Sequence, residues 1–203
     1  MADQIIDQGP GYTIAISDTA ETLVPYGPAQ RPTGDVNHGW TDLRDHPEWV
    51  DRIPEAAKSK GLAELLRTMA DPVSRVMSTA CECAAFDQGA EGAGGPAWLV
   101  GGFVITVFRD EERNTDPQNF VELARYILGG IEPTSDHHIG FEMIVEPMKS
   151  YFGRSDCYDL MIKPFGRGAS ETDAWTAFDH AASAAAKALT RDRPNKTEFA
   201  ETP

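Results

Sequence analysis

Apolar and polar residues in the second half of the chain follow the same order twice. Two strand-like runs precede an amphipathic helical segment across residues 76–129, and the order recurs across residues 139–190. The clearest run, residues 98–108 (WLVGGFVITVF), is rich in β-branched and aromatic side chains, as strands are. Both faces of this run are apolar, which predicts a strand with material packed over each side of the sheet. The other predicted strands are residues 76–86, 139–148 and 157–165.

The helical segments are marked by buried stripes and caps. Residues 117–128 and 171–189 each carry apolar side chains at helical spacing, and Ser170 with Asp173 predicts a capped start for the second. Residues 55–70 carry a similar stripe that includes Leu62, Leu65 and Leu66. A shorter helix is predicted to begin near Pro47, because an early proline suits a first helical turn.

The N-terminal part of the chain is less regular. We expect residues 1–10 to be frayed and residues 12–16 (YTIAI) to form an edge strand. Residues 24–40 hold many prolines and glycines, which predicts a long connection. The polar tail after Arg191 is expected to be flexible.

These patterns predict a single-domain α+β protein. We expect an antiparallel sheet of four to five strands in the order ββα-ββα, with the helices at 117–128 and 171–189 on one face. The segment 47–70 is expected to cover an end of the sheet or part of its second face. The predicted organisation is an N-terminal helical and Pro/Gly-rich extension over 1–54, a core over 55–190 and a tail over 191–203.

Composition and charge narrow the class of protein. The 203 residues carry a net charge of −14, and their basic residues are scattered, so nucleic-acid binding is not expected. The excess acid fits solubility, an acidic proteome, or a surface for a basic partner. No apolar run approaches the ~20 residues that span a bilayer, and the first residues do not resemble a secretory signal. We therefore expect a cytoplasmic protein without membrane contact.

One candidate binding surface is a set of charged side chains on one sheet face. Strand alternation places the residues opposite the apolar rows together on the second face: Glu82, Glu142, Glu146, Asp159 and Lys163. Such a face can bind a partner, hold a cation or supply an acid and a base. It can also be a solvated surface with one cross-strand ion pair to Lys163.

Two further candidates involve cysteine. Cys81 and Cys83 point the same way on a strand, and with Cys157 and either His137 or His138 they could form a zinc-type site. The alternative is that the three cysteines are small buried side chains, and their odd number argues against disulfides. Nucleophilic catalysis by a Cys–His pair is a third reading, with Cys157 the better nucleophile because Arg154 lies nearby.

No motif in the sequence specifies a reaction or a cofactor. We therefore expect a non-enzymatic binding or assembly protein that uses the open sheet face or the N-terminal arm. Its partner would be another protein or further copies of the same chain. The alternative is a small enzyme that depends on the Cys/His set or on the carboxylates, with or without a metal.

Overall fold

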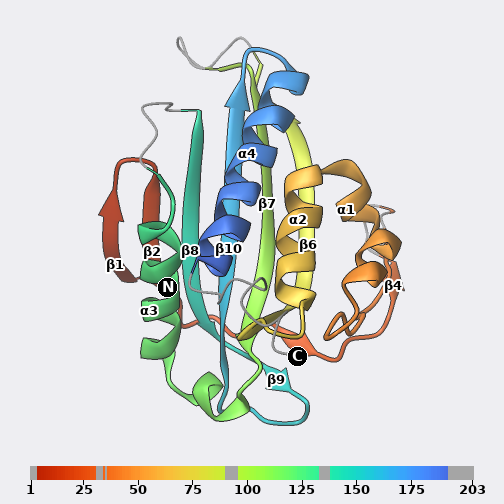
Figure 1. Ribbon diagram of the computed structural model, residues 1–203, viewed down its shortest axis with the longest axis vertical. Helices are drawn as coiled ribbons and strands as arrows, with labels where there is room; N and C mark the ends of the chain where they lie inside the picture. Colours follow the sequence, from red (N-terminus) through yellow and green to blue (C-terminus); the bar gives the residue numbers. More distant parts are fainter. Residues whose placement is uncertain (1–3, 31–33, 35, 90–95, 133–137, 192–203) are drawn as a thin grey trace, which may run out of the picture.

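The computed structural model of the protein describes residues 4–30, 34, 36–89, 96–132 and 138–191. It shows a mixed α+β fold built on one large sheet (Figure 1). The sheet has six strands in the order β1-β2-β8-β10-β7-β6. Their bounds are Gln4–Gly9 (β1), Tyr12–Ile16 (β2), Ile139–Pro147 (β8), Tyr158–Gly168 (β10), Trp98–Phe108 (β7) and Val76–Asp87 (β6).

The four strands predicted in the second half of the chain are confirmed. They are β6, β7, β8 and β10, and they lie side by side with every pair antiparallel. The two-faced apolar run of β7 lies between β10 and β6. Its Val100 and Val104 are buried under the helices, and its Val107 is buried on the other face of the sheet.

The N-terminal residues correct two expectations. Residues 4–9 are not frayed, because they form β1, the outer strand at one edge of the sheet. The strand at residues 12–16 is therefore the second strand and not an edge strand, and it runs parallel to β8. The sheet consequently has six strands and is not wholly antiparallel. Ile14 is fully buried, which explains why this short strand joins the core.

Helices cover one face of the sheet, as Figure 1 shows with the helices toward the viewer. They are α2 (Lys60–Ala70), α3 (Pro117–Gly129) and α4 (Glu171–Thr190), and all three contribute to one apolar core. The Ser170–Asp173 cap of α4 is present as a reciprocal capping box. Residues 47–70 were predicted to cover an end of the sheet or part of its second face. This prediction was wrong for α2, the longer helix of that segment, which packs beside α4 on the helical face.

The short elements lie at the margins of the sheet. The helix predicted near Pro47 is a 3-10 helix, η1 (Pro47–Arg52), and it is followed by α1 (Pro54–Lys58) beside β6. A second 3-10 helix, η2 (Glu111–Thr115), joins β7 to α3. The long connection contains the two-residue strands β3 (Leu23–Val24), β4 (Ala29–Gln30) and β5 (Val36–Asn37). β3 pairs with another short strand, β9 (Ser150–Tyr151), whereas β4 and β5 pair with each other.

The packing of α4 on the sheet is a contact between backbones. A Cβ added at Gly166 of β10 would overlap the backbone nitrogen of Phe178 and lie 2.6 Å from the carbonyl oxygen of Ala174. Alanines fill the same side of α4 and are buried. The alanine-rich stripe of this helix therefore reflects a close approach to the sheet, as small side chains permit.

The helix α2 is fixed to α4 in the same way. The backbone of Gly61 lies against Asp179, where an added Cβ would lie 2.7 Å from the Asp179 Cα atom. The carboxylate of Asp179 accepts hydrogen bonds from the Gly61 amide at 3.0 Å and from the Ser59 hydroxyl. A glycine here costs helix propensity, about 1 kcal/mol against alanine, and the crossing of the two helices explains its presence.

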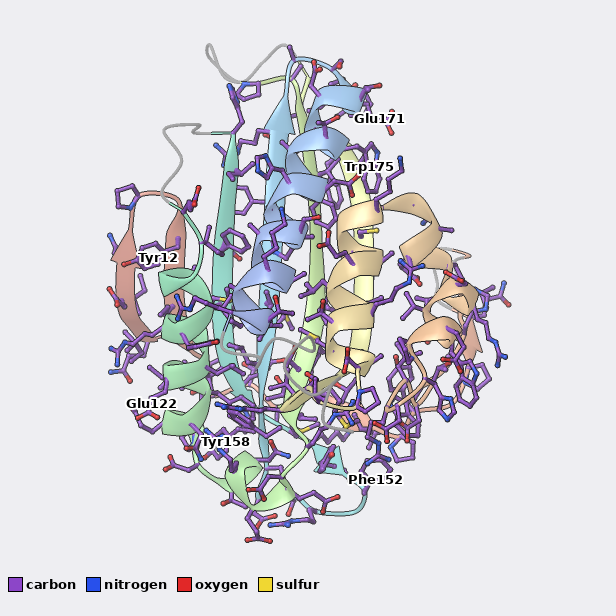
Figure 2. The ribbon with its side chains drawn as sticks, in the orientation of Figure 1. Tyr12, Glu122, Phe152, Tyr158, Glu171 and Trp175 are labelled. Atoms are coloured by element: carbon purple, nitrogen blue, oxygen red, sulfur yellow. The ribbon has the colours of Figure 1, made fainter. Side chains whose placement is uncertain are left out.

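Part of the N-terminal region covers one end of the second face of the sheet. The arm, defined as residues 17–30 and 36–43, crosses the lower end of the sheet in Figure 1. There Val24 joins a smaller core with Met77, Val107 and Tyr151. Phe152, labelled in Figure 2, makes an edge contact with Trp40 at 5.4 Å between ring centroids. These contacts hold the arm against the sheet.

The α4 contact yields a test of the fold. We expect Gly166→Ala to lower the free energy of unfolding by about 2 to 3 kcal/mol, because a side chain there overpacks against backbone atoms that cannot move aside. Urea unfolding measures the change. Gly101→Ala is the control, since nothing lies within 4 Å of a Cβ at Gly101. A glycine in a strand costs about 0.5–1 kcal/mol relative to alanine, so the control should be neutral or slightly stabilised. Equal effects of the two substitutions would contradict the packing described here.

Candidate functional site

The predicted charged face exists, and strand register arranges its side chains in rows. One row across the sheet contains Glu146 of β8 and Asp159 of β10, which are directly paired. A second row contains Glu142 paired with Lys163, and Glu82 paired with Phe103. All five predicted residues therefore lie on the face away from the helices, but they separate into groups with different surroundings.

Glu142 and Lys163 form the cross-strand ion pair that the sequence suggested as the alternative to a binding role. The Lys163 ammonium donates to a carboxylate oxygen of Glu142, and both side chains are partly exposed. Such a pair typically contributes less than about 1 kcal/mol to stability. The pair is accounted for by this surface interaction alone.

Glu146 and Asp159 form a buried pair of carboxyl groups under the arm. Glu146 is 8% exposed and Asp159 is fully buried. The Thr22 hydroxyl donates to Glu146 Oε1 at 3.4 Å. Among the described residues, neither carboxyl oxygen of Asp159 has a hydrogen-bond partner. Burying an ionised carboxylate without a partner costs free energy, so these surroundings favour the protonated form of the acid.

The surroundings of Asp159 raise its pKa well above the usual range. The largest cause is removal of the carboxyl from water, and the charge of Glu146 acts in the same direction. The nearby Thr22 hydroxyl offsets a smaller part of the shift. The pair can therefore hold a proton under conditions in which exposed carboxylates are ionised.

A groove of about 890 Å³ begins beside this pair and follows β6. Residues 78–84 of β6 line it without a gap, together with Phe103 of β7, Met161 of β10 and Glu146 of β8. The arm contributes one wall through Glu21–Leu23 and residues 36–39, among others. The other wall comes from the end of η1 and from α1, at Arg52–Glu55 and Lys58. In Figure 1, α1 and β4 lie to the right of β6.

The groove combines an apolar floor with charged walls. Phe103 and Met161 are only partly buried, although they belong to the interior strands β7 and β10. Four acidic and two basic side chains line the same space: Glu21, Glu55, Glu82, Glu146, Arg52 and Lys58. Concave sites with apolar walls and a few polar groups are the usual places for ligands.

The cysteines do not come together. Cys81 and Cys83 point toward the helical core, as their common direction on the strand predicted, whereas Cys157 belongs to the small core on the other face. His138 lies at the start of β8, and its carbonyl accepts from the Arg167 amide. His137 lies outside the described residues. In the ranges that the structure covers, no three His, Cys, Asp or Glu side chains are grouped to hold a metal ion.

The thiol environments do not favour nucleophilic chemistry. Burial raises the pKa of Cys83 to about 11 and raises the pKa of Cys81 further. Burial also raises the pKa of Cys157, and the nearby Arg154 offsets only part of this. Raised thiol pKa values leave little thiolate near neutral pH. These are properties of buried, inert cysteines.

Sequence reasoning found the carboxylates but missed the groove. Its walls come from residues within 21–29, 36–43 and 52–58, which the sequence indicated only as a connection and short helices. Thr22, Arg52 and Lys58 follow no motif that would assign them to a site. One feature of the sequence did indicate that this connection packs against the rest of the protein, namely aromatic residues such as Trp40 within a Pro/Gly-rich segment.

Comparison with known protein families, with curated proteins and with solved structures finds no match to this chain. No helix in the described ranges combines the length and apolar character needed to cross a membrane. The site must therefore be interpreted from its own geometry.

The buried pair generates a prediction on pH. Because the pKa of Asp159 is raised by folding, the folded protein binds this proton more tightly than the unfolded chain. Its contribution to stability is complete below the ordinary pKa of about 3.9 and disappears as the pH rises through the raised value. Asp159→Asn removes this titration. As the pH rises through that range, the free energy of unfolding of Asp159→Asn should increase relative to that of the wild type, by up to about 1.4 kcal/mol per pH unit.

Urea unfolding from pH 4 to 8 measures this difference. Asp156→Asn is the control, because Asp156 is exposed and its hydrogen bond with Arg154 lowers its pKa. That variant should show no gain that grows with pH. Parallel curves for wild type and Asp159→Asn would show that Asp159 ionises normally in the folded protein.

The cysteine environments generate a second prediction. At pH 8 a thiol with a pKa of about 11 is about one-thousandth ionised, against about a quarter for a free cysteine. Cys81 and Cys83 of the native protein should react with dithiodipyridine at least about 100-fold more slowly than free cysteine. Cys157 should also react more slowly than free cysteine, and all three thiols should react at the normal rate after denaturation. Stoichiometric zinc in natively purified protein, or one fast thiol, would contradict this description.

Proposed function

We propose that the protein is a non-enzymatic binding protein whose ligand occupies the groove between β6, the arm and α1. The single observation that carries the proposal is the groove itself. It places partly exposed Phe103 and Met161 beneath charged walls, on the sheet face opposite the helices. Exposed apolar surface rimmed by polar groups is typical of interaction sites.

The N-terminal arm has a specific role in this proposal. It acts as an extension that completes the site, since Glu21–Leu23 and residues 36–39 face the same space as β6. The arm is held by the Val24 contacts, by the Trp40–Phe152 contact and by the Thr22–Glu146 hydrogen bond at the groove.

Self-assembly is the other form of binding that the sequence suggested. Two copies of a chain with a net charge of −14 repel each other unless the interface compensates the charge. The groove is also recessed between two walls, which suits an inserted segment better than the surface of a second globular copy. These features support a different molecule as the partner.

A second candidate is an enzyme that depends on carboxyl groups, and the Glu146–Asp159 pair favours it. A neighbouring pair in which one member holds a proton is suited to acid–base chemistry. Glu146 lines the groove, but Asp159 is fully buried, so only Glu146 could touch a substrate. A binding role requires only the groups that line the groove. Acid–base catalysis by the pair would also require Asp159, which is buried away from a substrate.

The binding proposal is tested by filling the groove. A chemically diverse fragment set is screened against ¹⁵N-labelled protein by NMR. We expect the fragments that bind to shift the amides of residues 78–84 and 103, and Ala84→Trp to weaken this binding at least 10-fold. Ala84 is half-buried on the floor of the groove, so the larger side chain occupies its space.

Ala169→Trp is the matched control, because Ala169 is exposed in the bend before α4 and is not among the residues that line the groove. It should bind the fragments like the wild type. Fragments that bind elsewhere, or that are unaffected by Ala84→Trp, would refute the proposal. A bound fragment recovered with an altered mass would favour the enzyme.

A further inference from the structure

The groove carries its acidic side chains at two ends. Glu146 lines one end, together with Glu21, which directly precedes the Thr22 hydroxyl donor to Glu146. Glu82 of β6 lines the other end, together with Glu55 of α1, and α1 packs beside β6. The distribution of these carboxylates, and not only their number, therefore bears on what the groove can hold.

Strand register gives the separation of the two ends. Glu82 lies in the same row across the sheet as Glu142, and Glu146 lies four residues further along β8. Strands β7 and β10 lie between β6 and β8. With about 4.8 Å between neighbouring strands and about 3.4 Å per residue along a strand, the backbones of Glu82 and Glu146 are about 20 Å apart. The groove therefore runs obliquely across four strands.

The floor between the two ends is apolar. Met161 of β10, Ile105 of β7 and Ala80 of β6 are paired in one row, and all three line the groove. This row lies midway between the two rows that carry Glu146 and Glu82. A ligand that spans both ends thus rests on apolar side chains along its middle, where transfer of an apolar chain from water is favourable.

Asp159 adds to the negative charge that the Glu146 end can carry. It is paired with Glu146 across the strands and is fully buried. In the part of the chain that the structure describes, neither of its carboxyl oxygens has a hydrogen-bond partner. Two adjacent carboxyl groups away from water favour a neutral member unless a positive charge lies beside them. A cationic group of a ligand against Glu146 would supply that charge.

The two basic side chains of the lining lie beside groups of their own wall. The Arg52 guanidinium lies over the Trp49 ring, 4.9 Å from its centroid. Lys58 follows Glu55 by three residues on α1, and their charges act on the pKa of Cys83 in opposite directions. With four acidic and two basic side chains, the groove carries an excess of negative charge. Complementary charge favours a cationic ligand.

We propose that the groove binds a linear aliphatic diamine, with one terminal ammonium group at Glu146, the other at Glu82 and Glu55, and the apolar chain over the floor between them. This proposal rests on the binding function proposed for the groove. It adds the class of ligand and the direction in which the ligand lies.

The test measures the affinity of defined diamines for the full chain by isothermal titration calorimetry at pH 7. The probe is 1,12-diaminododecane, and 1,4-diaminobutane is its short counterpart. Both termini are charged at this pH, because alkylamines such as the lysine side chain have a pKa of about 10.4. The long diamine should bind at least about 10-fold more tightly, since only it can reach both acidic ends.

A third compound separates charge from chain length. In 12-aminododecan-1-ol a hydroxyl replaces one ammonium group at the same length. It should bind at least about 10-fold more weakly than the diamine, because one acidic end then has no cation.

Substitutions at one end of the groove test the orientation. Glu55→Gln combined with Glu82→Gln removes two charges with little change in side-chain size, and should weaken the diamine at least about 10-fold. The amino alcohol should change by less than about twofold, because its single ammonium group can bind at the unaltered Glu146 end. Glu122→Gln is the matched control, since Glu122 is exposed on α3 and is not among the residues that line the groove (Figure 2). It should bind both compounds like the wild type.

Equal affinities for the diamine and the amino alcohol, or a diamine affinity that the double substitution leaves unchanged, would overturn the two-ended site. Equal affinities for the long and the short diamine would show that the carboxylates bind any small cation, and would also overturn it. If fragments bind in the groove and lose affinity in Ala84→Trp while the diamine does not bind, the groove function stands and only the diamine proposal fails.

Discussion

The close contact between α4 and the sheet determines the positions of the other elements. Gly166 lets the backbone of α4 approach β10 to a distance that no side chain permits. Asp179 on the same helix then fixes the start of α2 through Ser59 and Gly61. Because α1 ends immediately before Ser59, this contact also places Glu55 and Lys58. One wall of the groove thus depends on a helix packed on the far face of the sheet.

The second wall depends on contacts of a different kind. The arm covers the lower end of the second face by burying Val24 among the side chains of β6, β7 and the segment around β9. In doing so it encloses Glu146 and Asp159, which raises the pKa of Asp159. The free energy gained from the apolar contacts of the arm therefore offsets the free energy lost by burying the two carboxyl groups. Natural proteins retain such costs mainly at functional sites, and this one lies at the end of the groove.

The edge of β6 is covered in part by neighbouring elements. Its first residues are satisfied by Ser74 and Arg109, and α1 packs beside the strand at Cys83, which is buried. The groove follows residues 78–84 of this strand, between the arm and residues 52–58. The edge strand therefore contributes both to the helical core and to the candidate site on the second face.

The sequence by itself determined much of the local structure. The β-branched and aromatic run of residues 98–108, the helical stripes and the Ser170 cap are local patterns, so the strands β6, β7, β8 and β10 and the helices α3 and α4 could be predicted. Alternation along the other strands placed Glu82, Glu142, Glu146, Asp159 and Lys163 on one face, because side-chain direction in a strand has a fixed period.

Only the tertiary structure decided how these parts meet. β2 pairs in parallel with β8, although about 120 residues separate them in the chain, and nothing local specifies such a partner. Asp159 differs from Glu142 only because the arm covers one and leaves the other exposed. The groove arises where the arm and residues 52–58 lie beside β6 and its neighbouring strands. Burial and proximity between remote segments depend on the packing of the whole chain, and local residue patterns do not encode them.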